Sequence, residues 1–276
     1  MTDSESKQVI FKVQRYDPEQ RGVPHWQGFM VPSRRGMTVL DGLLYIKENL
    51  DSTLAFRTSC RMGVCGSCGM LVNNYPHLAC HTQIEEFKSD IITVKPLANL
   101  AIIKDLVVDL SPMFARHKSV KPYIIRKDTA EMEKPTAEYY QTSGELDAFE
   151  QFSYCVKCGI CLAACPTSAS DRLFLGPQAL AQCYHYNADT RDDGKEERNG
   201  VAASEHGVWH CHLAGACSEA CPKGVDPALA IQLLKGQMAG QALGLGKKQP
   251  AAKVVAPPKE KKPGIPFPEF TGKGNK

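Results

Sequence analysis

The sequence predicts an α+β chain in which a strand-rich N-terminal part precedes a helical C-terminal part. Residues 8–14 alternate apolar and polar side chains, as a half-buried strand does. Residues from about 146 onward show helical spacing instead, and prolines stand at two expected helix starts. The cysteines divide in the same way, with four in the first part and two runs in the second. Two domains, each built around its own cysteine set, therefore account for most of the chain.

The N-terminal domain is expected to open with a β-hairpin, in which residues 26–31 pair with the first strand. Thr38 and Asp41 then form a capping-box pattern, although Asp is a weaker partner than Glu. The pattern opens a helix whose apolar face consists of Leu40, Leu43 and Leu44. Two short strands are predicted further on, at residues 70–72 and 91–94.

The first cysteine set has the spacing C-x4-C-x2-C followed by one distant cysteine, which is the plant-type [2Fe–2S] pattern. Glycines interleave with these cysteines, and glycine allows backbone angles that a loop wrapped around a cluster requires. The order of strands, helix and cluster loop is that of a β-grasp ferredoxin. We therefore expect residues 1–118 to form a plant-type ferredoxin domain. The set comprises Cys60, Cys65, Cys68 and Cys80, with Gly63, Gly66 and Gly69 between and after them.

Two segments are expected to connect or follow the domains. Residues 99–118 predict a helix with Ile102, Ile103, Leu106 and Val107 as its apolar stripe, which Pro112 kinks or ends. Residues 119–145 are charged and polar and predict a linker. Residues 247–276 are rich in Lys, Pro and Gly and predict an extended or disordered tail.

The second cysteine set follows the bacterial ferredoxin pattern C-x2-C-x2-C-x3-C-P, and its second run repeats this spacing with one cysteine missing. Ala214 occupies the missing position. In that pattern the last cysteine of each run crosses over to the other cluster. One cluster then has four thiolates and the other has three, which predicts a [4Fe–4S] and a [3Fe–4S] centre in a helical domain over residues 146–246. The four-cysteine group is Cys155, Cys158, Cys161 and Cys221, and the three-cysteine group is Cys165, Cys211 and Cys217.

Two helices of this domain are predicted from the residues at which they would begin. One is expected to begin at Pro177 and to end near Asn187. It contains the twelfth cysteine, Cys183, which we interpret as a small core residue, with a spare thiol near the three-iron centre as the alternative. The other is expected to begin at Asp226 and Pro227, an N-cap followed by proline, and to run to about residue 243.

Disulfides and zinc are the two alternative interpretations of so many cysteines. No secretory signal opens the chain, and cysteine-rich proteins of reducing compartments bind metal more often than they form disulfides. Zinc sites usually consist of two C-x2-C pairs with a long spacer, and the triple C-x2-C-x2-C run suits one tetrahedral ion poorly. Iron–sulfur clusters remain the favoured interpretation for both sets.

Composition excludes several other classes. The sequence contains no run of eighteen apolar residues, so it predicts no transmembrane helix. The formal charge of +3 counts the cysteines as neutral, so ligated clusters would make the protein mildly acidic. No basic patch with interleaved aromatic residues is present, and we therefore expect no nucleic-acid partner.

A plant-type cluster domain followed by a domain with one four-iron and one three-iron site resembles the iron–sulfur subunit of succinate dehydrogenase and fumarate reductase, over roughly residues 8–245. The resemblance implies an electron-transfer subunit between a flavoprotein, which carries FAD and the dicarboxylate site, and a membrane anchor, which helps to bind quinone. Electrons would pass between FAD and quinone through the [2Fe–2S], [4Fe–4S] and [3Fe–4S] clusters in that order. The expected location is the cytoplasmic face of a prokaryotic membrane, as a peripheral subunit.

The resemblance also implies quinone contacts beside the three-iron centre. Ubiquinone-linked members often carry a Trp five residues after the cysteine that matches Cys165, and Ser170 stands there in this chain. The segments around 187–198 and 221–235 are more similar to the fumarate reductase branch, which favours menaquinone. The candidate quinone-site residues are His212, Gln232 and Lys235, with a structural histidine, a surface glutamine and an exposed helix cation as the respective alternatives.

Two rival functions keep the clusters but change the partner. One is a free-standing polyferredoxin that serves diffusing proteins. The other is the iron–sulfur subunit of a related enzyme that uses heterodisulfide or another acceptor. Co-purification with a flavoprotein and a membrane anchor would separate the favoured function from both.

Overall fold

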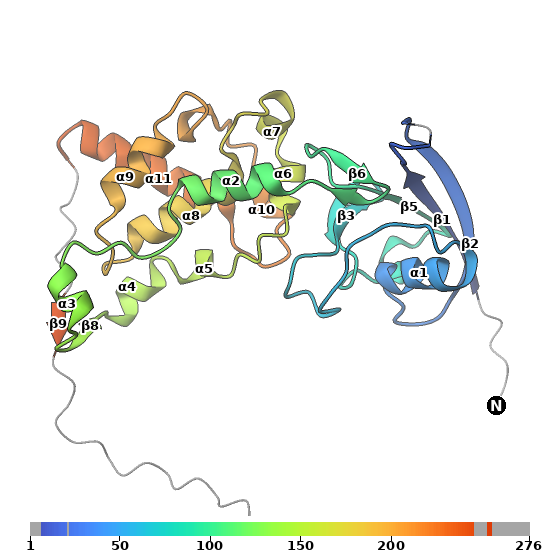
Figure 1. The fold of residues 1–276 in the computed structure, drawn as a ribbon, viewed down its shortest axis with the longest axis horizontal. Coiled ribbons are helices and arrows are strands. Elements are labelled where there is room, and N and C mark those ends of the chain that lie inside the picture. Colours follow the sequence, from blue (N-terminus) through green and yellow to red (C-terminus); the bar gives the residue numbers. More distant parts are fainter. Residues whose placement is uncertain (1–6, 21, 246–252, 256–276) are drawn as a thin grey trace, which may run out of the picture.

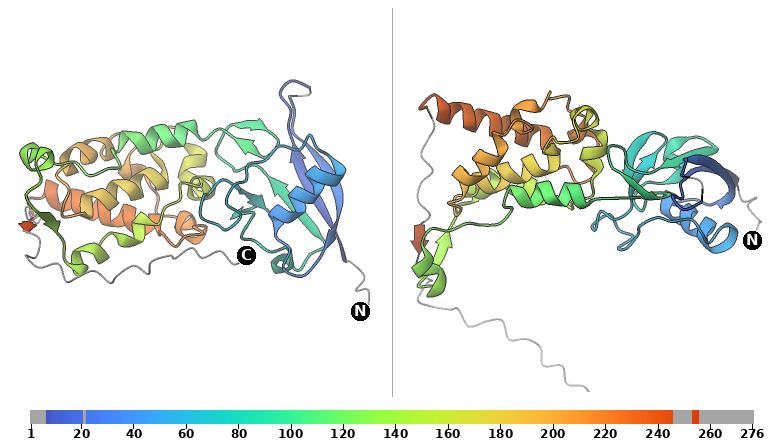
Figure 2. Two further views of the ribbon diagram at one scale, coloured as in Figure 1. Left: turned by 60° about the horizontal axis from the view of Figure 1, so that its bottom comes forward. Right: turned by 45° about the horizontal axis from the view of Figure 1, so that its top comes forward.

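The structure is a computed structural model, and it describes residues 7–20, 22–245 and 253–255. A β-rich lobe formed by the N-terminal part lies beside a helical lobe formed by the C-terminal part (Figure 1). Figure 2 shows the same division from two further sides. The predicted α+β class is therefore confirmed. Among the described residues, no helix is both long enough and apolar enough to cross a bilayer.

A five-stranded sheet with the order β2-β1-β5-β3-β4 forms the centre of the β-rich lobe. The first two strands make the predicted antiparallel hairpin, and β5 pairs parallel to β1 on its other side. The strand β4 was not predicted; it follows a turn at Asn73 and Asn74, which both have positive φ, as a tight hairpin turn requires. The strands are β1 (Lys7–Arg15), β2 (His25–Ser33), β3 (Gly69–Val72), β4 (Tyr75–Leu78) and β5 (Ile91–Lys95).

The helix α1 (Val39–Tyr45) covers one face of this sheet and continues into a π-helical turn, η1 (Ile46–Leu50). The capping box is present: the Thr38 hydroxyl accepts from the Asp41 N–H at 3.1 Å, and Asp41 Oδ2 accepts from the Thr38 N–H at 2.9 Å. Gly42 lets the helix approach the sheet, because a Cβ there would lie 2.2 Å from the Phe11 ring. The buried faces of helix and sheet form one hydrophobic core.

The helix predicted over residues 99–118 is wrong. The segment forms a small hairpin of β6 (Ile102–Lys104) and β7 (Val107–Val108), and the helix α2 (Ser111–Ser119) starts only after it. Asp105 lies between the two strands with φ of 46°, a conformation that interrupts a right-handed helix. Pro112 lies in the first turn of α2 instead of ending a helix, because backbone N–H groups in the first turn have no partner within the helix.

Residues 119–145, predicted as a linker, contain α3 (Thr129–Glu133), β8 (Glu138–Tyr140) and the start of α4 (Ser143–Asp147). The strand β8 pairs antiparallel with β9 (Lys253–Val255). Apart from β9, the predicted tail at residues 247–276 lies outside the described residues. The predicted domain boundaries stay a prediction, and α2, near the first of them, packs against the helical lobe at α8.

The helical lobe surrounds α8, whose residues are almost all buried. Both predicted helices are present: α8 has Pro177 in its first turn, and α11 begins after Asp226, whose carboxylate accepts from the Leu229 N–H at 3.0 Å. α11 packs along α8 over much of its length. The elements are α5 (Glu150–Ser153), α6 (Ile160–Ala164), α7 (Pro166–Ser170), α8 (Gly176–Ala188), α9 (Lys195–Ala202), η3 (Val208–His210), α10 (Ala216–Glu219) and α11 (Pro227–Ala242).

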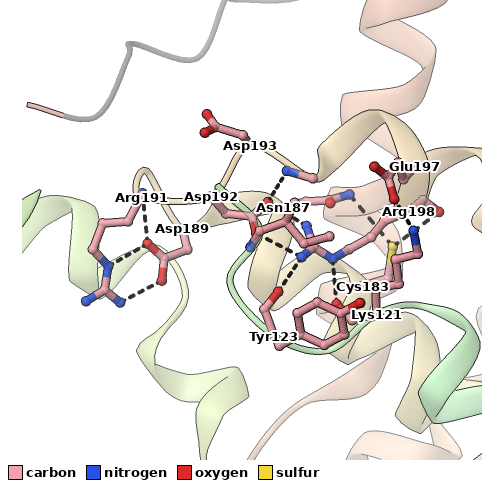
Figure 3. A network of polar contacts seen from close by, with 12 residues as sticks. Lys121, Tyr123, Cys183, Asn187, Asp189, Arg191, Asp192, Asp193, Glu197 and Arg198 are labelled. Carbon is pink, nitrogen blue, oxygen red and sulfur yellow. Dashed lines mark hydrogen bonds and ion pairs between the residues drawn. The ribbon is translucent and has the colours of Figure 1, made fainter. Parts of the chain in front are cut away.

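A buried polar network ties the segment after α2 to the helical lobe (Figure 3). Arg198 on α9 is fully buried and forms an ion pair with Asp192 at 2.5 Å. It also donates to the carbonyls of Lys121 at 3.0 Å and Tyr123 at 2.6 Å. Cys183 lies in the same region with no exposed surface, and burial raises the pKa of its thiol to about 12. Cys183 is therefore an inert core residue, as the favoured interpretation expected.

Candidate iron–sulfur centres

The first cysteine loop directs backbone N–H groups at its own sulfurs. The N–H groups of Met62 and Val64 both donate to Cys60 Sγ at 3.4 Å, and Gly63 N–H donates to Cys80 Sγ at 3.3 Å. The two bonds from Met62 and Val64 lower the pKa of the Cys60 thiol to about 6. N–H groups that point at sulfur stabilise the negative charge of a cluster and tune its reduction potential.

The other side of this loop is buried. Ser67 N–H donates to Cys65 Sγ and Cys80 N–H donates to Cys68 Sγ, both at 3.5 Å. Burial raises the pKa of the Cys68 thiol to about 12, so iron ligation must supply the positive charge that keeps this sulfur ionised. The loop therefore has an exposed rim at Met62 and a buried side against the rest of the lobe.

The four-cysteine group of the second set lines a single cavity in the helical lobe. Cys155, Cys158 and Cys161 come from one run, and Cys221 reaches the same cavity from the other run. Much of the remaining lining is apolar, and Gln178 Nε2 approaches Cys155 Sγ at 4.0 Å. Burial, followed by the neighbouring thiolates, raises the pKa of Cys161. The crossing of Cys221 is the feature that the bacterial ferredoxin pattern requires.

The three-cysteine group gathers separately from this cavity, with Cys165 and Cys211 both near Cys217. Burial, and then the nearby Cys165 and Cys211, raise the pKa of Cys217 to about 11. Cys165 Sγ accepts from the Ser168 N–H and Cys211 Sγ accepts from the Leu213 N–H, each at 3.4 Å. A fourth cysteine would be expected in the loop between Cys211 and α10, and Ala214 is exposed there.

These surroundings fit clusters better than single ions. Among the described residues, no three ligand-type side chains converge closely enough to hold one metal ion. Cluster ligands stand further apart, because each binds a different iron. The sulfurs also have N–H donors and apolar packing around them, as cluster sites do. The residues therefore suit the three predicted clusters: one-electron carriers that the chain would hold, insulate and tune.

The quinone candidates differ in how closely they approach the three-cysteine group. Lys235 on α11 donates from Nζ to the Cys211 carbonyl at 2.8 Å and lies 6.0 Å from the centre of the Trp209 ring. His212 is exposed, with its ring 6.1 Å from that of His210. Gln232 is exposed on α11, one turn before Lys235. Trp209 is 53% exposed and was not predicted as part of this region; its position two residues before Cys211 was the available signal.

Comparisons with known proteins agree with this arrangement. Residues 10–115 match the family of 2Fe-2S iron-sulfur cluster binding domains, and residues 151–225 match the 4Fe-4S dicluster domain. The chain is 49% identical over 235 residues to the fumarate reductase iron-sulfur subunit of Mycobacterium tuberculosis, covering 85% of this chain and 94% of the relative. It is 44% identical to the same subunit of Escherichia coli O6:H1, over 83% of this chain and 92% of the relative.

A solved structure shares the fold. It is described as the Mycobacterium smegmatis Sdh1 complex in the apo form, with a TM-score of 0.78 and 23% identity, over 86% of this chain and 98% of that chain. The similarity to the fumarate reductase subunits extends through both cysteine sets, which confirms the family expected from them and disfavours the ferredoxin and heterodisulfide alternatives. The chain belongs to the family of iron–sulfur subunits of fumarate reductase and succinate dehydrogenase, and its function is electron transfer.

Proposed function

We propose that the three cysteine groups hold a [2Fe–2S], a [4Fe–4S] and a [3Fe–4S] cluster, and that the chain relays electrons through them between FAD on a flavoprotein and a membrane quinone. The observation that carries this proposal is the single cavity lined by Cys155, Cys158, Cys161 and Cys221. Since Cys221 belongs to this group, the other group keeps only three thiolates. A three-thiolate site suits a cluster that lacks one iron.

The chain's own residues would hold and insulate the clusters. Bound clusters supply one-electron steps, and the protein sets their potentials through hydrogen bonds, burial and charge. The first group has the most N–H donors at sulfur, whereas Cys161 and Cys158 of the second group are desolvated. Desolvation disfavours the added negative charge of a reduced cluster. The second cluster is therefore proposed to have a lower potential than the first.

The two ends of the relay would meet different partners. Met62 and Val64 are 69% and 52% exposed on the rim of the first cysteine loop, which suits docking of a flavoprotein there. Trp209 and Leu213 are exposed beside Cys211, which suits docking of a membrane anchor at the opposite end. A subunit bound to such an anchor would be peripheral at the cytoplasmic face of a prokaryotic membrane.

Lys235 is the strongest of the three quinone candidates. Its ammonium group stands within hydrogen-bond reach of a cluster-ligand carbonyl, so its tip is held beside the third group. A cation at that place would stabilise the negative charge that develops on a quinone oxygen during reduction. Gln232 and His212 would provide further hydrogen bonds. Menaquinone is proposed as the carrier, on the absence of Trp at Ser170 and on the similarity to fumarate reductase subunits.

Electron paramagnetic resonance combined with an iron count tests the proposal. The complex purified with its partners should contain about nine irons per chain, from two, four and three in the clusters. It should give a three-iron signal when oxidised and two further signals when reduced. Eight irons or fewer, with no three-iron signal after anaerobic preparation, would contradict the cluster assignment.

The variant Ala214→Cys tests the three-iron site directly. Ala214 is exposed in the loop between Cys211 and α10, where the second run lacks a cysteine. A thiol at that position should let the third cluster take a fourth iron, which removes the three-iron signal and lowers the potential. Ala214→Ser is the matched control, since a hydroxyl is a poor iron ligand. An unchanged three-iron signal in Ala214→Cys would refute the alignment of the second run.

A further inference from the structure

The first and second cysteine loops touch each other at a glycine. Gly66 lies between Cys65 and Cys68 of the first loop. A Cβ on Gly66 would lie 2.9 Å from both Cα and Cβ of Cys158, in the second loop, and 2.8 Å from the Val156 carbonyl oxygen. Real Cβ atoms essentially never approach other atoms so closely, so no other residue fits here without moving one of the loops.

A second glycine makes the same approach from the start of β3. A Cβ on Gly69 would lie 3.1 Å from the Cys158 carbonyl oxygen and 3.3 Å from Leu97 Cδ1. The space bordered by Gly66, Gly69, Leu97 and Cys158 is about 10 Å³, which is at the lower limit for one water molecule. The two loops are therefore packed together where the two lobes meet.

We propose that Gly66 and Gly69 are positioning residues that set the separation between the first and second clusters. The proposal rests on the proposed cluster assignment: Cys65 and Cys68 for the [2Fe–2S] cluster, and Cys158 for the [4Fe–4S] cluster. The main chain of Gly66 then lies directly between a ligand of one cluster and a ligand of the next.

The displacement that a methyl group would cause follows from the distances. Ordinary van der Waals contact begins at 3.4 Å, so alanine at Gly66 requires a movement of at least about half an ångström. The atoms that it would meet are a backbone carbonyl, a Cα and a Cβ, which cannot rotate away as the end of a long side chain can. Cys158 would also be held by an iron of the proposed second cluster. The movement therefore falls on the distance between the loops.

Backbone strain is the competing explanation for any effect of alanine at Gly66. Two other glycines near the first cluster allow strain to be distinguished from contact with the second loop. Gly66 has φ of 74°, so alanine is strained there whatever the space. Gly63, in the same loop, has φ of 70°, but its Cβ would meet only the His81 ring, at 3.3 Å. Gly69 has the contact with Cys158 without a positive φ. Gly63→Ala thus carries strain without contact with the second loop, and Gly69→Ala carries that contact without strain.

The experiment compares Gly66→Ala, Gly69→Ala and Gly63→Ala in the complex purified with its partners. An iron count and the three cluster signals of the unaltered complex first establish the cluster assignment, so its failure is distinguishable from failure of this proposal. The main measurement is the microwave power needed to saturate the reduced [2Fe–2S] signal. A neighbouring reduced cluster speeds the relaxation of this signal, and the effect falls steeply with distance. Freeze-quench reduction gives the rate of transfer to the second cluster.

Gly66→Ala and Gly69→Ala should saturate at lower power than the unaltered protein and should transfer electrons to the second cluster more slowly. Gly63→Ala strains the first loop and involves a donor to Cys80 Sγ, but it does not contact Cys158, so it should change both quantities by less than either of the other two variants. Equal saturation and equal rates in all four proteins, with full iron content, would overturn the proposal. Loss of iron in all three variants would overturn it too, because backbone strain or disruption of the first loop would then be enough to explain the effect without any contact with Cys158. Loss of iron in the Gly66 and Gly69 variants alone would support it, since only these two positions contact Cys158.

Discussion

Removing the Arg198 side chain should release the segment that follows α2 from the helical lobe. The guanidinium group is fully buried and makes two bonds to Asp192, at 2.5 and 2.8 Å, and two to main-chain carbonyls. Asp192 in turn accepts from the Ile125 N–H at 2.8 Å, so one buried pair holds the segment on both sides. In Arg198→Ala the carboxylate stays buried without its cation, and two carbonyls lose their donor.

The size of the effect follows from this loss. Breaking a buried ion pair by removing one partner costs about 3–5 kcal/mol. Local opening would become easier by that amount, and hydrogen exchange of the amides held by the pair would accelerate by about 10²–10⁴-fold. The amides of Ile125 and of Asp193, which donates to the Ile125 carbonyl at 2.8 Å, report this opening.

Hydrogen–deuterium exchange read by mass spectrometry on peptides covering residues 121–127 and the segment around Asp193 is the appropriate assay. Lys121→Ala is the matched control in the same network. Lys121 forms its ion pair with Glu197 in solvent, where their side chains are 45% and 53% exposed, so screening makes that pair weak. Unchanged protection in Arg198→Ala, or equal loss of protection in both variants, would refute the argument that the buried pair holds the segment.

Three further substitutions test separate parts of the chain. Lys235→Ala should lower quinone turnover by about tenfold or more, the value of a charge-assisted hydrogen bond, while reduction of an artificial dye stays near normal; equal loss in both assays would remove Lys235 from the quinone site. Asn99→Ala removes one amide that donates to three carbonyls at the end of α6, at 2.9, 3.1 and 3.2 Å. It should destabilise the protein by about 1–3 kcal/mol in chemical denaturation, and an unchanged midpoint would show that these carbonyls find other donors. Thr38→Ala should cost about 1 kcal/mol by the same assay, whereas Thr38→Ser should be close to neutral.

The cysteine spacing could predict the candidate site because it encodes geometry directly. A run such as C-x2-C-x2-C-x3-C places thiols around a cluster within one short loop. The crossing of Cys221 followed from the same pattern, although it joins distant parts of the chain. Ala214 stands where the pattern would have a cysteine, and this exception indicated that one of the two groups has only three thiols. Lys235 and its bond to the Cys211 carbonyl could only be reached through the family resemblance, because a lone helix lysine has no distinctive pattern.

The elements that were wrong or missed depend on interactions that sequence spacing does not carry. Ile102, Leu106 and Val107 fit a helical stripe, but Asp105 fixes the segment as a hairpin. Its buried carboxylate accepts from Arg15 Nε at 3.0 Å and from the Ala55 N–H at 2.8 Å, so distant residues determine the local conformation. Propensity is a weak guide where tertiary hydrogen bonds of this kind are available.

The glycines of the first cysteine loop show a finer limit of the same kind. Backbone angles were the expected reason for all three, and positive φ confirms that reason for Gly63 and Gly66. For Gly69 it is wrong, because its φ is not positive. The reason there is the approach of Cys158 from the other domain. A single sequence cannot distinguish a glycine needed for its φ from one needed for its missing side chain.

The contact between the loops also bears on how far the two lobes are independent. The hydrophobic core of the β-rich lobe includes Ile160 and Ala163 of α6 and Ala220 after α10, so the helical lobe completes that core. Asn99 also joins the lobes, because its side-chain amide donates to the carbonyls of Leu162 in α6 and of Cys165 just after it. A shared core is close-packed and resists small changes of distance. Electron transfer between clusters in different lobes requires a constant separation, and a flexible linker between two closed cores could not provide it. The packing that joins the lobes therefore fixes the separation on which the proposed electron path depends.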